Sequence, residues 1–119
     1  MELQYFTLSE FDSPDDPGSG SLMDEHFLAT LEEIRRICNF PFIINSGFRT
    51  IRHNIAVGGK PNSAHLRGLA ADISITDSSK RFTILSVALY LGIKRIEIAK
   101  TWIHLDIDPT LLQSVAMLA

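Results

Sequence analysis

The chain has few of the features that would assign it to a membrane, to nucleic acid or to a disulfide-stabilised fold. Its 119 residues include one cysteine, Cys38, so no internal disulfide can form. No apolar run approaches the ~18 residues of a membrane span. The formal net charge of −3 leaves no basic surplus for nucleic acid. The N-terminal MELQYFTLSEF also lacks the basic start and apolar core of a signal peptide. We therefore expect synthesis in the cytoplasm, no membrane insertion and no nucleic-acid partner.

Length and composition favour one compact unit. With 45% hydrophobic residues among 119, the chain is large enough for one core and too small for two. We therefore expect a single domain over residues 1–119. Cys38 lies in an apolar stripe and is expected to be a small buried side chain. The sequence carries no signal for an oligomeric state, and we expect a monomer.

Local patterns in the first half of the chain predict a loop, a helix and a strand. Residues 11–21, FDSPDDPGSGS, are rich in turn-forming residues. Ser21 followed by Asp24 predicts a helix start of the capping-box type, and apolar residues at helical spacing continue to Cys38, before Asn39 and Pro41. FIINS, residues 42–46, is typical of a short buried strand. Residues 47–68 show no steady period, and a loop of that length is usually functional.

The second half predicts a sheet with further helices. Residues 69–75 form a short apolar strand, and 94–99 and 102–108 are alternating strands joined by a turn at Lys100 and Thr101. A second helix is predicted over 77–92, with an apolar stripe through Phe82, Leu85 and Leu89. A last short helix is predicted over 109–118. This order of elements predicts an α+β fold, a mainly antiparallel sheet flanked by two or three helices.

Two of the four histidines stand close to carboxylates in the sequence. In WIHLDID the strand period of two directs His104 and Asp106 to one face, opposite the aliphatic residues. In SAHLRGLAADI, His65 and Asp72 flank a run of glycine and alanine that leaves room for a nearby group. Two imidazoles and one carboxylate can bind zinc with a fourth position open, as in catalytic sites. Spacing alone leaves open whether these three residues meet.

The remaining histidines give weaker signals. His26 falls in the first predicted helix beside acidic residues and is expected on the surface. His53 lies in the long loop, where we favour a surface position over a place in a site.

Three segments resemble a known superfamily. SAHLRGLAADI resembles the S-x-H-x-x-G-x-A-x-D signature of the zinc D-alanyl-D-alanine peptidases, which include phage endolysin peptidases and the hedgehog-type domain. WIHLD is similar to their aromatic-x-His-x-Asp segment, and SGFRTIRHNIAVGG to their S-G-[FY]-R-[ST] strand and loop. The resemblance runs nearly end to end in the same order. It implies a D-Ala-D-Ala peptidase-like fold over the whole chain, with zinc as cofactor.

The resemblance also implies roles for individual residues. His65, Asp72 and His104 would bind zinc, and the small residues between the first two would let the backbone close around the ion. Arg49 occupies the position of an arginine near the family's site, where its guanidinium suits a substrate carboxylate or an oxyanion. A structural ion pair is the alternative for Arg49. Ser63 would bind substrate or simply hold a turn.

The general base is less clearly indicated. In several relatives a carboxylate precedes the last histidine ligand by three positions, and here that position is Thr101, which cannot carry the proton. Asp106 shares the strand face of His104, and Glu97 lies across the predicted hairpin from it. We favour Asp106 as the catalytic base over Glu97, and either carboxylate could instead orient His104.

Together these features predict a zinc peptidase that hydrolyses amide bonds in the stem peptides of peptidoglycan. The cleaved bond is left open between a D-Ala-D-Ala carboxypeptidase and an endopeptidase reaction. The absence of a signal peptide fits a phage endolysin that reaches the cell wall by other means, and it also fits a small bacterial relative. Thr101 keeps an alternative open, a non-catalytic module that retains the fold and metal and binds wall peptides or serves in a phage particle.

Overall fold

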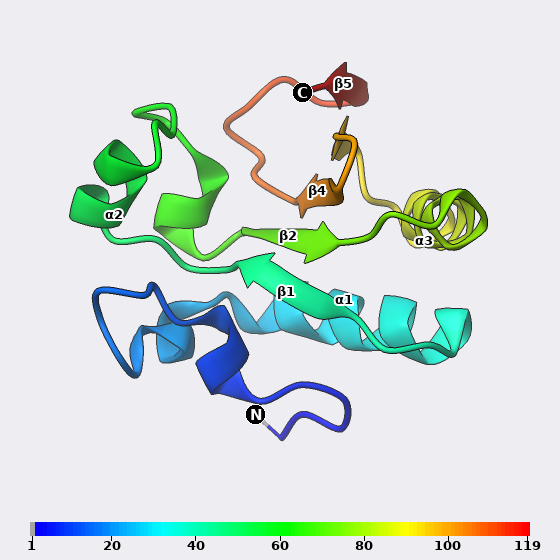
Figure 1. The fold of residues 1–119 in the computed structure, drawn as a ribbon, viewed down its shortest axis with the longest axis horizontal. Coiled ribbons are helices and arrows are strands. Elements are labelled where there is room, and N and C mark those ends of the chain that lie inside the picture. The colour runs from blue at the N-terminus through cyan, green and yellow to red at the C-terminus, as the bar shows by residue number, and fades with distance from the viewer. Residues whose placement is uncertain (1) are drawn as a thin grey trace.

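The computed structural model describes residues 2–119 and contains one five-stranded sheet (Figure 1). The strands are β1 (Ile43–Ser46), β2 (Ala70–Ser74), β3 (Arg95–Ile98), β4 (Trp102–Asp106) and β5 (Val115–Leu118). Their order in the sheet is β1-β2-β4-β3-β5, and every neighbouring pair is antiparallel except β3 and β5. With three α-helices in the described residues, this confirms the predicted α+β class.

The aliphatic face of the sheet packs on two helices, α1 (Glu25–Cys38) and α3 (Ser78–Tyr90). The cluster joins side chains of the central strands to side chains of both helices, among them Ala71, Ile73, Ile103, Leu105, Phe27, Leu31, Ile84 and Ala88. Because strand side chains alternate, the polar residues of β2 and β4 lie on the opposite face. None of the helices in residues 2–119 has the length and apolarity needed to cross a membrane.

The ends of α1 follow local capping chemistry. Asp24 is the N-cap, and its carboxylate accepts a hydrogen bond from the Phe27 backbone N–H at 2.9 Å. The predicted start at Ser21 is therefore wrong, because Ser21 belongs to a separate 3-10 helix, Ser19–Leu22. α1 ends at Asn39, as expected, and Asn39 adopts the left-handed conformation with φ of 60°. Cys38 is buried and unpaired, also as expected.

The strands and α3 lie close to their predicted positions, but the buried stripe of α3 differs. Asp77 caps the helix through the Lys80 backbone N–H. Phe82 is 72% exposed and Leu89 is 57% exposed, whereas Ile84 and Ala88 are fully buried. Apolar residues occur on more than one side of this helix, so the period alone did not determine which side packs on the sheet.

The segment 47–68 is not the irregular loop that the sequence predicted. It contains α2 (Ile51–Ala56), capped by Thr50, and a 3-10 helix, Ala64–Arg67, capped by Ser63. Both helices are too short to show a hydrophobic period, and side-chain caps hold them instead.

The predicted C-terminal helix over 109–118 is also wrong. The Asp108 carboxylate accepts hydrogen bonds from the backbone and hydroxyl of Thr110, which form a turn. Ser114 then adopts φ of 60°, and this left-handed residue interrupts any helix. The next four residues form β5, which occupies the free edge of β3, starting with the Val115 N–H bonded to the Lys94 carbonyl. Pairing along that edge satisfies backbone groups that a short isolated helix would leave unpaired.

Candidate metal centre

Strand register places a row of functional side chains across the polar face of the sheet. Asp72 pairs with Ser46 on one side and with His104 on the other, and His104 pairs in turn with Glu97. Glu97 is level with Met117 of the edge strand β5. Cross-strand partners point to the same face, so the row runs through β1, β2, β4, β3 and β5. The predicted opposition of Glu97 and His104 across the hairpin is confirmed.

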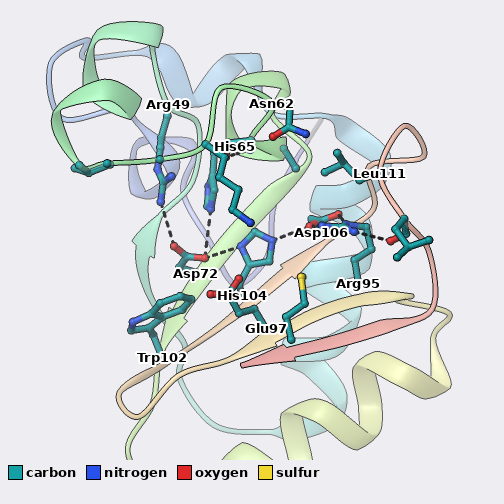
Figure 2. Close-up of a pocket in the computed structure, with 18 residues that line it drawn as sticks. Arg49, Asn62, His65, Asp72, Arg95, Glu97, Trp102, His104, Asp106 and Leu111 are labelled. Atoms are coloured by element: carbon teal, nitrogen blue, oxygen red, sulfur yellow. Dashed lines mark hydrogen bonds and ion pairs between the residues drawn. The ribbon is translucent and has the colours of Figure 1, made fainter. Parts of the chain in front are cut away.

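His65 reaches this row from the 3-10 helix above it (Figure 2). The Ser63 hydroxyl oxygen accepts a hydrogen bond from the His65 backbone N–H, and the His65 carbonyl accepts one from the Arg49 N–H. The buried ring donates from Nδ1 to the Gly47 carbonyl at 2.7 Å. The other ring nitrogen, Nε2, therefore faces Asp72 and lies 3.3 Å from its Oδ1.

His104 is held between two carboxylates. Its Nδ1 lies 2.9 Å from Asp72 Oδ1, and its Nε2 lies 2.7 Å from Asp106 Oδ2 (Figure 2). Burial lowers the pKa of His104, but the hydrogen bonds with Asp106 and Asp72 outweigh it and raise the pKa to about 9. Burial likewise raises the pKa of the Asp72 carboxyl, and the hydrogen bonds from His104 and His65 hold it well below its usual value.

The three predicted ligands meet in one place. His65, Asp72 and His104 each offer one ligand atom, and these atoms lie within 4.8 Å of one another. Both rings donate their outer N–H to protein acceptors, Gly47 and Asp106, which leaves the inner nitrogens to bind a cation. Without a metal, a proton on His104 Nδ1 bridges to Asp72. The residues therefore fit zinc, with two nitrogens and one oxygen that leave a further position open.

Two of the small residues near His65, Gly68 and Ala71, contact other parts of the chain, whereas Ala70 pairs with Asp106 on the polar face of the sheet. Gly68 is left-handed, with φ of 70°, and a Cβ there would lie 2.4 Å from the Leu22 carbonyl oxygen. The Gly68 carbonyl in turn accepts the Asp24 N–H at the start of α1. Ala71 packs in the hydrophobic core. Gly68 thus allows the segment that carries His65 to pack on the N-terminal region of the chain.

Arg49 lies beside the ligand Asp72 and makes three side-chain hydrogen bonds. Nη2 lies 3.4 Å from Asp72 Oδ2, Nη1 donates to Asn54 Oδ1, and Nε donates to Ser46 Oγ. Burial lowers the pKa of Arg49, while the charge of Asp72 raises it. The Asn54 side chain is buried and also donates to the Lys60 carbonyl. The ion pair that was the alternative for Arg49 is present, and the guanidinium still lines the cavity.

Asp106 is the most enclosed carboxylate of the site, with 1% exposure. Besides the His104 ring N–H, its oxygens accept from Arg95 Nε and from the Asp108 backbone N–H. Arg95 also donates to the Leu112 carbonyl, which ties the site to the C-terminal segment. Sequence reasoning missed Arg95. The hairpin register that placed Glu97 opposite His104 also places Arg95 opposite Asp106, so that signal was available.

The ligands line a cavity of about 420 Å³ together with Arg49, Glu97 and Trp102. Ser63 lines it too, from its capping position. His53 lies outside this cavity and lines a second hollow next to it. His26 is exposed at the start of α1, as expected.

A buried carboxylate and two oriented imidazoles line an open cavity, an arrangement typical of catalytic rather than structural metal sites. The profile of the family Peptidase M15 matches residues 4–106, and the chain belongs to this family. M15 peptidases are zinc-dependent, which agrees with the His/Asp/His arrangement and confirms the resemblance and the cofactor read from the sequence. A search of curated proteins gives no match.

Proposed function

We propose that this M15 peptidase hydrolyses amide bonds in peptidoglycan stem peptides. The observation that carries the proposal is the convergence of His65, Asp72 and His104 at the floor of an open cavity. When bound there, zinc polarises the scissile carbonyl and activates the attacking water. The segments SAHLRGLAADI and WIHLD supply the ligands, and their resemblance to the D-alanyl-D-alanine peptidases supports the choice of substrate.

Glu97 is the carboxylate that we propose as proton carrier. It lines the cavity next to His104, and no side chain in residues 2–119 donates a hydrogen bond to it. Its oxygens are therefore free to accept a proton from water and return it to the leaving amine. Asp106, the sequence-based preference, has its oxygens occupied by Arg95, Asp108 and His104. We propose that Asp106 orients His104 as a ligand.

Arg49 and Ser63 are proposed to contact the substrate. A guanidinium has five N–H groups, so Arg49 can keep its bonds to Asp72, Ser46 and Asn54 and still donate into the cavity. A carbonyl oxygen that gains charge during hydrolysis suits such a donor. The Ser63 oxygen accepts the His65 N–H, which leaves its own hydroxyl proton for a substrate acceptor.

The proposed setting is the bacterial cell wall, which the protein would reach as a phage lysis enzyme or as a small bacterial relative, acting as a monomer. The test is a suspension of purified cell wall treated with the zinc-loaded protein, followed by turbidity and by mass spectrometry of the released fragments. We expect clearing that stops with a chelator and resumes with zinc. His26→Ala is the matched control and should clear the wall at the wild-type rate.

A non-catalytic wall-binding module is the second candidate, because Thr101 occupies the position of the carboxylate found in relatives. Fragment release by the wild-type protein decides between the two, with Glu97→Gln as its control. If the chain is a peptidase with Glu97 as proton carrier, this variant should bind zinc normally and release no fragments. Sedimentation with the wall but no fragments from the wild-type protein would favour the binding module.

A further inference from the structure

A second hollow adjoins the metal centre on the polar face of the sheet. It has a volume of about 310 Å³, against about 420 Å³ for the cavity that holds the ligands. The residues that line both hollows are Arg49, Val57, Asp72 and Trp102. Figure 2 shows Arg49, Asp72 and Trp102 at one end of the first cavity and Leu111 and Arg95 at the other. The Asp72 carboxylate therefore lies between the two hollows, and the ligand set is central.

Strand register gives the two hollows a common direction. The second hollow adds Asn45 and Ser46 of β1, at one edge of the sheet. The first cavity extends to Leu112 and to Met117 of β5, at the other edge. Ser46 and Met117 are the two ends of the row that contains Asp72 and His104, so the two hollows follow one line across all five strands, and together they are called the groove.

The second hollow offers polar groups that the protein leaves free. Within residues 2–119, no hydrogen bond engages the Asn45 amide or the His53 ring, and the Ser46 hydroxyl accepts from Arg49 but keeps its own proton to donate. Val57 and Trp102 supply apolar walls beside these groups. Hydrogen-bond donors and acceptors with an indole face suit the amide groups and small side chains of a peptide.

The same hollow is poorly suited to a free chain end. Arg49 is the only arginine or lysine among its lining residues, and this guanidinium is already paired with Asp72. A terminal carboxylate would therefore lack an unpaired cation there.

We propose that the second hollow is a subsite for an extended peptide, built around Asn45, Ser46 and His53. A substrate chain then lies across both hollows, with peptide on each side of the metal. The bond that is cut is therefore internal, and the protein acts as an endopeptidase rather than releasing a single terminal residue. This inference rests on the proposed function, because it concerns the same metal centre.

The first experiment compares two wall peptides, one of which carries a second, cross-linked stem peptide. One is the uncross-linked pentapeptide ending in D-Ala-D-Ala, and the other is the cross-linked stem-peptide dimer, each prepared with a free and with an amidated C-terminus. Zinc-loaded protein is expected to cut an internal bond of the dimer and to release no single C-terminal alanine from the pentapeptide, as measured by mass spectrometry. Release of one terminal residue alone, or a requirement for a free terminal carboxylate, would overturn the inference.

The second experiment locates the subsite with His53→Ala and Asn45→Ala. Each should lower kcat/KM for the dimer roughly 10-fold, as expected for the loss of about one hydrogen bond to substrate. His26→Ala is the matched control and should change nothing. A peptide that is too short to reach the second hollow should be cut at the same rate by the wild-type protein and by His53→Ala. An equal loss on long and truncated peptides would show that His53 acts elsewhere.

Binding separates failure of the subsite from failure of the proposed chemistry. Trp102 is the single tryptophan of the chain and lines both hollows, so its fluorescence reports ligands in the groove. The cross-linked dimer should change this fluorescence when it binds to the zinc-loaded Glu97→Gln variant. The additional substitution His53→Ala should weaken binding of the dimer roughly 10-fold. If the dimer binds in this way but the wild-type protein cuts no peptide, the proposed peptidase activity is refuted and the subsite stands. If the dimer binds equally tightly with and without the His53→Ala substitution, the subsite is refuted.

Discussion

Replacing Asp106 by asparagine tests whether this carboxylate orients His104 or carries the proton. The change keeps the shape and removes the charge that accepts the His104 Nε2–H at 2.7 Å. Loss of such an acceptor behind a metal-binding histidine weakens metal binding by ~10- to 100-fold. That factor corresponds to about 1.4–2.7 kcal/mol of zinc binding free energy. We therefore expect a measurable fall in zinc affinity, with part of the turnover retained at saturating zinc.

The same substitution must also affect folding, because Asp106 pairs with the buried Arg95. Removing one partner of a buried ion pair leaves the other charge uncompensated and costs ~3–5 kcal/mol. The asparagine oxygen still accepts one hydrogen bond, so we expect the lower end of that range. A double variant, Asp106→Asn with Arg95→Met, removes the orphaned charge. Its free energy of unfolding should recover most of the loss, while its zinc affinity stays low.

Two assays separate these effects. Zinc affinity is measured by competition with a chromophoric chelator, and stability by guanidinium unfolding followed by circular dichroism, both on metal-free protein. Asp106→Asn that binds zinc within twofold of wild type, yet loses more than ~100-fold in kcat, would refute the reasoning. That result would identify Asp106 as the general base, whose individual contribution is of this size.

Four further predictions concern the metal ligands, Arg49 and the dependence of zinc binding and of stability on pH. His65→Ala and Asp72→Ala should each abolish tight zinc binding, as measured by metal content after gel filtration, whereas near-stoichiometric zinc in both would contradict the ligand set. Arg49→Lys should lower kcat/KM on wall peptides ~10- to 100-fold, because an ammonium lacks the planar donors that reach several acceptors at once, and full activity in Arg49→Ala would exclude a catalytic contact. Zinc displaces a proton from His104, whose pKa is raised to about 9, so affinity should rise about tenfold per pH unit between pH 7 and 8.5, and a plateau there would contradict the raised pKa. The raised pKa also stabilises the metal-free fold below the usual histidine value of 6.5, and this contribution is lost as pH rises through about 9, which unfolding at a series of pH values would detect.

Local patterns predicted most of the elements because their information is contained within each segment. The β3–β4 hairpin is an example, since two alternating strands joined by two residues fix their own register. That register alone placed Glu97 opposite His104. The position of Asp72 beside His104 required a second pairing, between β2 and β4, which are separated by a whole helix. There the family resemblance, rather than periodicity, named the three side chains that the structure brings together.

The prediction of a C-terminal helix failed for the opposite reason, because the structure of that segment is decided by distant residues. Whether residues 115–118 form a helix or a strand depends on the open edge of β3, which no local pattern records. The Asp108 turn and the left-handed Ser114 then turn the chain toward that edge. The apolar stripe of α3 is a similar case, because packing against the sheet and α1 decided between two possible sides.

The choice between Asp106 and Glu97 shows what a sequence pattern leaves undetermined at a catalytic site. A base and an orienting carboxylate both require a position within reach of His104, and strand alternation supplied that position for each of them correctly. They differ in which oxygen lone pairs remain free, and this depends on the donors that surround each carboxylate. Arg95 and the Asp108 N–H donate hydrogen bonds to the carboxylate oxygens of Asp106. Glu97 lines the cavity and has no such donors in the part of the chain that the structure describes. Roles at this site therefore follow from hydrogen-bond partners rather than from proximity to the metal ligands.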